Sequence, residues 1–266
     1  MVDNGARNTM RQVAVWVTLA AALGMAALAS VVPQSLAAQT ARSRPAAAPL
    51  QPKFTRIFGS DSTRIMNPAL SPDGRWIVFH SLGGNGTYHL WALPASGGTP
   101  NRLTSGSHGG YYPKWFPSGD RIAFTSAAPS PPGEQREYVM AIPFDVRTGR
   151  SAGPAQQISL EEASNPVVSP DGQRIAFGAG GGRLMVVPSA GGTARTVVRV
   201  DGNAGRPEWS PDGREIYFVA YLSGSTGFHL MRVSADSGPA QKVWSTPRRI
   251  GALNTTARQV LSAPES

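Results

Sequence analysis

Asn165-Pro-Val-Val-Ser-Pro-Asp-Gly-Gln-Arg-Ile-Ala-Phe177 decides the fold, because the chain repeats this stretch with small changes. Related segments occupy residues 67–79, 112–124 and 206–218, and each has proline at its second and sixth positions and ends in Ile-x-Phe. The sixth-position prolines are Pro72, Pro117, Pro170 and Pro211, which lie 45, 53 and 41 residues apart. A period of about 40–45 residues is typical of radial repeats with four strands per unit. An insertion at residues 127–134, rich in Pro and Ser, accounts for the long interval.

Each repeat predicts four short strands joined by tight turns. Ser-Pro-Asp-Gly suits a type I turn, because Pro presets the second position and Gly is favoured at the fourth. The Ile-x-Phe that follows places two large side chains on one face of a strand. A third strand is expected at residues 88–93, 137–142, 183–187 and 228–233, and a shorter fourth at residues 101–104, 156–159, 195–198 and 241–244. The second repeat has Phe-Pro-Ser-Gly instead, which keeps the turn but loses the Asp.

The composition favours an all-β protein over a helix bundle or a disordered chain. Of 266 residues, 41% are apolar and 15% charged, and 30 Gly and 23 Pro suit many tight turns. The absence of cysteine excludes disulfides, Cys-ligated metals and a thiol nucleophile. The formal net charge of +9 comes from arginines scattered over the turns, so the sequence predicts no basic stripe and no nucleic-acid partner.

The first 38 residues predict a secretory signal peptide. Arg7 and Arg11 precede an uncharged run from Val13 to Val32, and Ser35-Leu-Ala-Ala38 offers small residues at positions −3 and −1 of a cleavage site. An uncleaved anchor is the alternative, since about 20 apolar residues can span a bilayer. Both interpretations place the rest of the chain outside the cytoplasm. The expected location is periplasmic or secreted, with membrane attachment only if residues 13–32 are retained.

The repeats resemble those of the TolB-type β-propeller family, which are bacterial relatives of WD repeats. The recurring segment is followed in the first unit by Leu90-Trp-Ala-Leu-Pro-Ala-Ser-Gly-Gly98 and then by Leu103-Thr104. The resemblance covers residue 65 to about residue 245. It implies an all-β propeller of four-stranded blades, with four recognisable repeats near residues 65–105, 111–160, 164–200 and 205–246.

The two ends of the repeats predict an incomplete or truncated ring. Residues 39–52 are expected to be a flexible leader, followed by the propeller domain over residues 53–266. Ala252 to Leu261 matches the start of a repeat, so residues 250–266 are interpreted as a partial fifth unit. Because an open ring leaves sheet edges exposed, we expect that the chain can self-associate to complete it.

The resemblance implies an exported, non-catalytic scaffold that binds other envelope proteins or peptides. The alternative is the N-terminal propeller portion of a larger exported hydrolase, a prolyl-oligopeptidase-type peptidase or an amidohydrolase, whose catalytic domain is absent. The sequence contains no G-x-S-x-G and no H-E-x-x-H. We therefore expect no enzymatic activity, and we assign no catalytic, cofactor-binding or metal-ligating residue.

The remaining candidates have structural interpretations. The histidines are His80, His89, His108 and His229, and no pair has metal-ligand spacing. Gly178–Gly182 predicts a hairpin, because no helix follows it to form a phosphate loop. Asp73, Asp171 and Asp212 are expected to bond within turns, and Trp115 and Trp209 to pack in the core. Ligand-binding loops are expected at Gly83–Thr87, Gly106–Gly110, Ala127–Glu134 and Gly202–Gly205.

Overall fold

The structure, a computed structural model, describes residues 57–58, 65–83, 86–106, 109–127 and 136–246. These residues belong to a compact unit spanning Lys53–Ser266. The signal peptide and leader expected before residue 53 lie outside the described residues, as does the partial fifth repeat expected at residues 250–266. Within the described part of the chain, no helix is long and apolar enough to cross a membrane.

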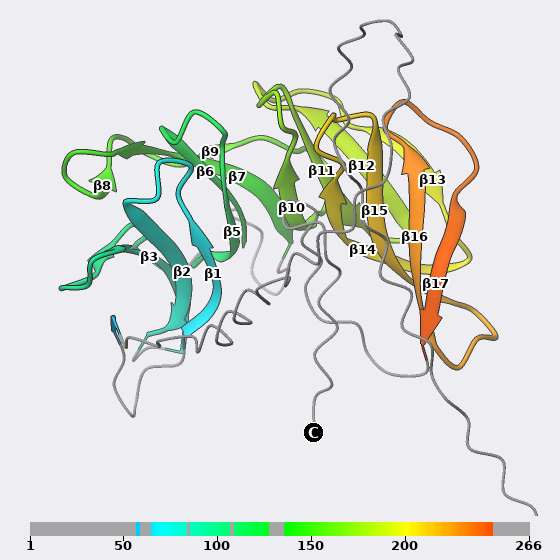
Figure 1. The fold of residues 1–266 in the computed structure, drawn as a ribbon, viewed down its shortest axis with the longest axis horizontal. Coiled ribbons are helices and arrows are strands. Elements are labelled where there is room, and N and C mark those ends of the chain that lie inside the picture. Colours follow the sequence, from blue (N-terminus) through cyan, green and yellow to red (C-terminus); the bar gives the residue numbers. More distant parts are fainter. Residues whose placement is uncertain (1–56, 59–64, 84–85, 107–108, 128–135, 247–266) are drawn as a thin grey trace, which may run out of the picture. The chain divides into compact units, whose positions relative to one another are not determined.

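The described strands form four antiparallel sheets, the blades, which follow one another along the chain (Figure 1). Blade 1 contains β1 (Ile65–Leu70), β2 (Trp76–Leu82), β3 (Tyr88–Pro94) and β4 (Asn101–Arg102). Blade 2 contains β5 (Tyr111–Trp115), β6 (Arg121–Ala127), β7 (Glu137–Asp145), β8 (Arg150–Ser151) and β9 (Gln156–Gln157). Blade 3 contains β10 (Ser164–Val168), β11 (Arg174–Ala179), β12 (Arg183–Pro188) and β13 (Arg195–Arg199). Blade 4 contains β14 (Gly202–Trp209), β15 (Glu215–Leu222), β16 (Phe228–Ser234) and β17 (Gln241–Thr246).

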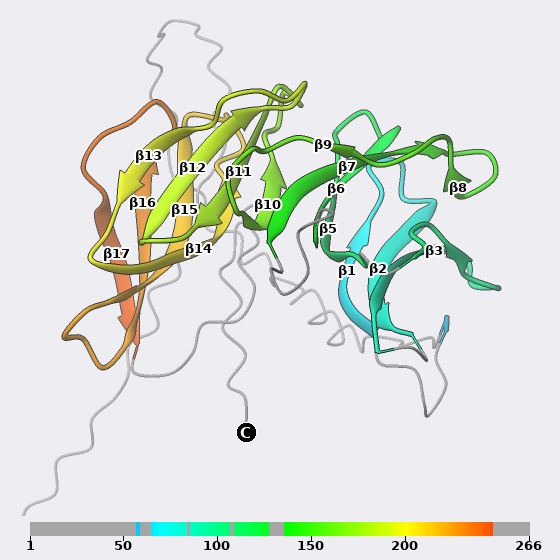
Figure 2. The same ribbon diagram turned by 180° about the vertical axis from the view of Figure 1, so that it is seen from behind.

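The predicted β-propeller of four-stranded blades is confirmed, with one blade for each full repeat. Among the described strands, blade 2 has a fifth, which the sequence did not predict. In its long third strand β7, Met140 and Ala141 pair with β9, while Phe144 and Asp145, nearer the end of the strand, pair with β8. The β8 hairpin therefore extends past the rest of the blade (Figure 2). The hairpin turn is fixed by Asp145, whose side chain accepts the Arg147 N–H at 2.9 Å.

Close packing between blades 1 and 2 requires glycine in that hairpin. Gly149 has φ of 69°, and an added Cβ would lie 2.0 Å from the indole of Trp76. The same indole donates its Nε1–H to the Val146 carbonyl at 2.9 Å. The β8 hairpin is thus held against blade 1 by both packing and a hydrogen bond.

The Ser-Pro-Asp-Gly turn joins the first two strands of a blade through local hydrogen bonds. In blade 1, Ser71 Oγ donates to Asp73 at 2.6 Å and accepts the Trp76 N–H at 2.9 Å. The bond from Ser71, followed by those from Arg75, lowers the pKa of Asp73 to about 2. Equivalent serine–aspartate bonds recur at Ser169–Asp171 and Ser210–Asp212. The three aspartates therefore bond within their turns, as the sequence predicted.

Hydrophobic side chains fill the space between consecutive blades. In blades 2 to 4 the Ile and Phe of the Ile-x-Phe segment face the preceding blade, and in blades 1 to 3 the residue between them faces the next one. Thus Val78 packs with Ile122 and Phe124 between blades 1 and 2. The other two layers contain the equivalent residues Ala123 with Ile175 and Phe177, and Ala176 with Ile216 and Phe218. Each large side chain buried in this way contributes about 1.5–3 kcal/mol.

A kink recurs in the first strand of each described blade, at the residue before the proline. We call these four strands, β1, β5, β10 and β14, the innermost strands. The kinked residues have left-handed backbones, with φ of 48° at Asn67, 52° at Tyr112, 52° at Asn165 and 50° at Arg206. Each kink coincides with a shift in the strand register, which marks a β-bulge. A left-handed residue other than glycine costs about 1–3 kcal/mol, so the packing of the blades must hold it in place.

Candidate binding site at the near rim of the blades

The innermost strands β1, β5, β10 and β14 all begin at the same end of their blades, which we call the near rim. The strand register shows which other segments meet there. Tyr111 pairs with Thr125, Ser164 with Gly178, and Gly202 with Leu222, so the ends of the second strands reach the same rim. The third strands start at this rim, and the opposite end is the far rim. Side chains from different blades can therefore converge at the near rim.

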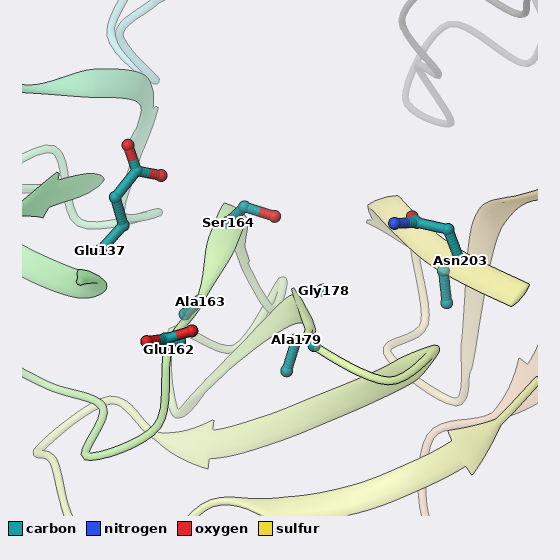
Figure 3. Close-up of a pocket in the computed structure, with 9 residues that line it drawn as sticks. Glu137, Glu162, Ala163, Ser164, Gly178, Ala179 and Asn203 are labelled. Carbon is teal, nitrogen blue, oxygen red and sulfur yellow. The ribbon is translucent and has the colours of Figure 1, made fainter. Parts of the chain in front are cut away.

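A cavity of about 290 Å³ lies at the near rim where blades 2, 3 and 4 meet. Its lining comes from the start of β7, the connection before β10, the end of β11 and the start of β14. The lining residues are Glu137, Glu162, Ala163, Ser164, Gly178, Ala179, Gly180, Asn203 and Ala204. In the view of Figure 3, Glu137 and Asn203 lie on opposite sides, with Glu162 and Ser164 between them. The cavity presents two carboxylates, a hydroxyl and an amide.

The two cavity carboxylates differ in their surroundings. Glu162 lies 3.6 Å from Arg136, in an ion pair whose side chains are both more than half exposed and which is therefore weak. Glu137 has no such partner among the described residues, and partial burial raises the pKa of its carboxyl. Its backbone carbonyl accepts the Ala163 N–H at 2.8 Å. Glu137 is thus an exposed carboxylate with no ion-pair partner among the described residues.

Four aromatic rings gather at the near rim between blades 1 and 2. His80 of β2 is 3% exposed, and the centroid of its ring lies 5.5 Å from that of Tyr88, 6.0 Å from that of Tyr111 and 5.7 Å from that of Tyr112. The backbone N–H of Tyr112 donates to Nδ1 of His80 at 3.4 Å. Burial lowers the pKa of His80 to about 4, so the ring is neutral at pH 7. We call these residues the tyrosine cluster.

Glu137 links the cavity electrostatically to the tyrosine cluster. Burial is the main cause that raises the pKa of the Tyr111 hydroxyl, and the negative charge of Glu137 raises it further. The three tyrosines are half-buried, so each presents part of its surface to solvent. The near rim therefore combines aromatic surface with the unpaired carboxylate of Glu137.

We did not predict Glu137, Glu162 or the tyrosine cluster as a site from the sequence. The signal that could have found the cluster is the position of its members within the repeat. Tyr88 opens a third strand and Tyr111 opens an innermost strand, so both belong to the same rim of adjacent blades. Nothing in the sequence pairs Glu137 with Asn203, because that meeting depends on how blades 2 and 4 flank blade 3.

The other histidines occupy places that the strands explain. His89 and His229 lie at equivalent positions in the third strands of blades 1 and 4, and both are buried. His89 contacts Arg102, while His229 bonds to Ser245, so each contacts its blade's fourth strand. His108 lies outside the described residues. Among the described residues, no group of three His, Asp or Glu side chains could hold a metal ion.

The predicted hairpin and core tryptophans are found where the sequence placed them. Gly178–Gly182 joins β11 to β12 as an antiparallel hairpin. The indole Nε1 of Trp115 donates to the Ala69 carbonyl at 2.9 Å, and that of Trp209 to the Val167 carbonyl at 3.1 Å. Each bond joins one blade to the preceding one. Of the four expected binding loops, residues 84–85, 107–108 and 128–135 lie outside the described part, while residues 202–205 form the start of β14.

Known proteins with similar sequences match only part of their own length. An uncharacterized protein of Agrobacterium fabrum (strain C58) is 26% identical over 158 residues, 58% of this chain and 39% of that protein. The uncharacterized peptidase YuxL of Bacillus subtilis (strain 168) is 26% identical over 160 residues, 60% of this chain and 22% of YuxL. The chain thus spans less than half the length of either relative. No protein-family model matches it.

Solved structures show the same fold. TolB from Agrobacterium tumefaciens superimposes with a TM-score of 0.57 and 20% identity, over 67% of this chain and 64% of that one. TolB from Acinetobacter baumannii superimposes with a TM-score of 0.55 and 20% identity, over 68% of this chain and 43% of that one. A puromycin-hydrolyzing peptidase of Mycobacterium tuberculosis superimposes with a TM-score of 0.50 and 16% identity, over 70% of this chain and 31% of that one. The chain shares the β-propeller fold of TolB proteins, which agrees with the family resemblance of its repeats.

Proposed function

We propose that this chain is an exported, non-catalytic β-propeller that binds proteins or peptides of the cell envelope at its near rim. The observation that carries the proposal is the meeting of the cavity and the tyrosine cluster on one rim. Tyrosine rings supply rigid contact area at little entropic cost, which is why they are enriched at binding surfaces. The shared fold with TolB proteins supports the same class of function.

The experiment is a capture of envelope proteins by the full chain, compared with a matched variant. Tyr88→Ser with Tyr111→Ser removes two rings of the near rim, while Tyr217→Ser on blade 4 is the control. A partner retained by the wild type and the control, but lost from the double variant, supports the proposal. Equal capture by all three proteins, with unchanged folding by circular dichroism, contradicts binding at the near rim.

Export and domain organisation form part of the proposal. Residues 1–38 act as a signal peptide, with an uncleaved anchor as the alternative, and residues 39–52 as a leader to the propeller. Cell fractionation and the N-terminal mass of the purified product distinguish cleavage from anchoring. A product found in the cytoplasm with its first residues intact would overturn export.

Self-association to complete a ring is also proposed, with residues 250–266 as a partial fifth unit. Three large apolar side chains of blade 4 are 45–48% exposed, namely Tyr221, Val243 and Trp244. Such surface supports assembly. The mass in solution tests this, and a monomer at all concentrations would contradict it.

A second candidate is the propeller portion of a larger exported hydrolase, favoured by the similarity to YuxL and to the puromycin-hydrolyzing peptidase. Sequencing the genomic DNA beyond the codon for Ser266 tests it. A reading frame that continues into a hydrolase motif would favour this candidate over the scaffold. In either case we expect the purified chain to cleave no peptide or amide, because residues 1–266 contain no hydrolase motif.

A further inference from the structure

The lining of the near-rim cavity is acidic, although the chain carries a formal charge of +9. Among the described residues that line the cavity, none is basic, while Glu137 and Glu162 both contribute carboxylates. The neighbouring Glu161 adds a third carboxylate, whose Oε2 is buried without a hydrogen-bond partner. A cavity lined by one sign of charge concentrates ligands of the opposite sign. The cavity lining therefore favours a cation, while the guanidinium groups of Arg136, Arg183 and Arg199 lie beside it.

Glu137 differs from Glu162, Glu208 and Glu215, each of which pairs with a basic side chain. Glu208 pairs with Lys114 at 2.6 Å, and Glu215 with Arg232 at 3.5 Å. Glu137 has no partner of this kind within the described part of the chain, yet its carboxyl is partly desolvated. Its side chain still reaches solvent, so a ligand cation can approach the carboxylate and pair with it. The Glu137 carboxylate at the cavity is thus available to pair with a cationic group of a ligand.

The adjacent aromatic surface selects the kind of cation. The charge of Glu137 reaches Tyr111, whose ring lies 5.3 Å from that of Tyr88 between centroids. A cation above an aromatic face gains attraction from the ring, and guanidinium groups also stack on such faces. The described carboxylates do not converge as metal ligands, so a compact metal ion is not favoured. A cationic group on a flexible stem suits both the cavity and the tyrosines.

We infer that the near rim binds a basic peptide segment, with an arginine or lysine head group held between the Glu137 carboxylate and the tyrosine cluster. This inference deepens the proposed function and rests on it. Glu137 supplies the charge, and Tyr111 and Tyr88 supply ring surface. Ser164 and Asn203, both in the cavity, offer a hydroxyl and an amide to the backbone of the peptide (Figure 3).

The test is fluorescence anisotropy of the full chain with a labelled, capped peptide that contains two arginines. The probe is compared with the same peptide carrying citrulline, which keeps the shape and removes the charge. We expect the arginine peptide to bind at least about tenfold more tightly. Equal binding of the two peptides, or binding of neither, overturns the inference.

The matched variants are Glu137→Gln and Glu215→Gln, which remove the same charge from the near and the far rim. We expect Glu137→Gln to weaken binding about tenfold and Glu215→Gln to leave it nearly unchanged. Equal losses would mean general attraction by net charge and would overturn the inference. Ultraviolet difference absorbance gives a second readout, since a cation beside Tyr111 should lower the pKa of its hydroxyl.

Failure of this inference is distinguishable from failure of the proposed function. If the arginine peptide does not bind but the double tyrosine variant still loses an envelope partner, the near rim is a binding surface for a partner of other chemistry. If the envelope partner is also retained by that variant, the proposed function fails as well.

Discussion

The Nζ atom of Lys114 lies 2.6 Å from Oε1 of Glu208, although 94 residues separate the two in sequence. Lys114 belongs to the innermost strand of blade 2 and Glu208 to that of blade 4. The ion pair therefore connects the two blades on either side of blade 3. The Glu208 side chain is 16% exposed and that of Lys114 40% exposed. Burial raises the pKa of Glu208, and the charge of Lys114 opposes that rise. The pair thus joins two blades that do not follow one another.

Removing the lysine should destabilise the fold, because it leaves the Glu208 carboxylate buried without its cation. We expect Lys114→Met to lower the free energy of unfolding by about 1–2 kcal/mol, less than for a fully buried pair because Lys114 is partly exposed. Urea unfolding measures the change. The double variant Lys114→Met with Glu208→Met should recover most of the loss, and purely additive effects would show that the two side chains do not interact.

The hairpin glycines at the cavity offer a second comparison. A Cβ added at Gly178 would lie 2.6 Å from the Ala204 carbonyl oxygen, whereas one at Gly180 would meet no atom within 4 Å. We expect Gly178→Ala to destabilise the protein by about 1–3 kcal/mol, because blade 4 must move away. Gly180→Ala should stay within about 0.5 kcal/mol. Thermal unfolding of both variants checks this, and similar melting temperatures would contradict the close approach of the two blades.

Acid should weaken the contact between blades 1 and 2 through His80. Its pKa is about 4 in the folded chain and 6.5 ordinarily, so the unfolded chain binds the proton more readily between these values. Stability is therefore complete above about pH 6.5 and falls as the pH drops toward 4, by at most about 1.4 kcal/mol per unit.

Urea unfolding at about pH 7 and about pH 5 measures this dependence. His80→Phe keeps a ring in place without a titrating group, so its stability should change less between the two pH values. Part of the dependence should remain, since burial also lowers the pKa of His89. An equal pH dependence in the variant and the wild type would show that His80 is not the responsible group.

The indole of Trp209 should stabilise the contact between blades 3 and 4. Trp209→Phe removes the hydrogen bond to the Val167 carbonyl and leaves space beside a side chain that is 3% exposed. We expect a loss of about 1–2 kcal/mol in the free energy of unfolding. Trp244→Phe is the matched control, because Trp244 is 45% exposed, and it should be almost neutral. Equal effects of the two substitutions would contradict the role of the buried indole.

The blades were predictable because their determinants are local. Ser71, Pro72, Asp73 and Gly74 form a turn through bonds within five residues, and the Ile-x-Phe that follows alternates across the sheet. Repetition of this segment then gives the number of blades. The β8 hairpin was missed because its signal, Asp145 to Gly149, is a single turn that occurs in one repeat only.

The candidate site was not predictable for the opposite reason. Glu137 begins a third strand in one blade, and Asn203 begins an innermost strand two blades later, so their approach depends on packing between sheets. Neither residue belongs to a motif. The pairing of Lys114 with Glu208 is hidden in the same way, since each looks like an isolated exposed charge within its own repeat.

The kink before the inner-strand proline has one more consequence. The same left-handed bend is occupied by an asparagine in blades 1 and 3, a tyrosine in blade 2 and an arginine in blade 4. An amide, a phenol and a guanidinium are thus interchangeable at a point where the backbone path stays constant. The backbone path at this bend is therefore set by the repeat, and the side chain there can change from blade to blade without altering the architecture.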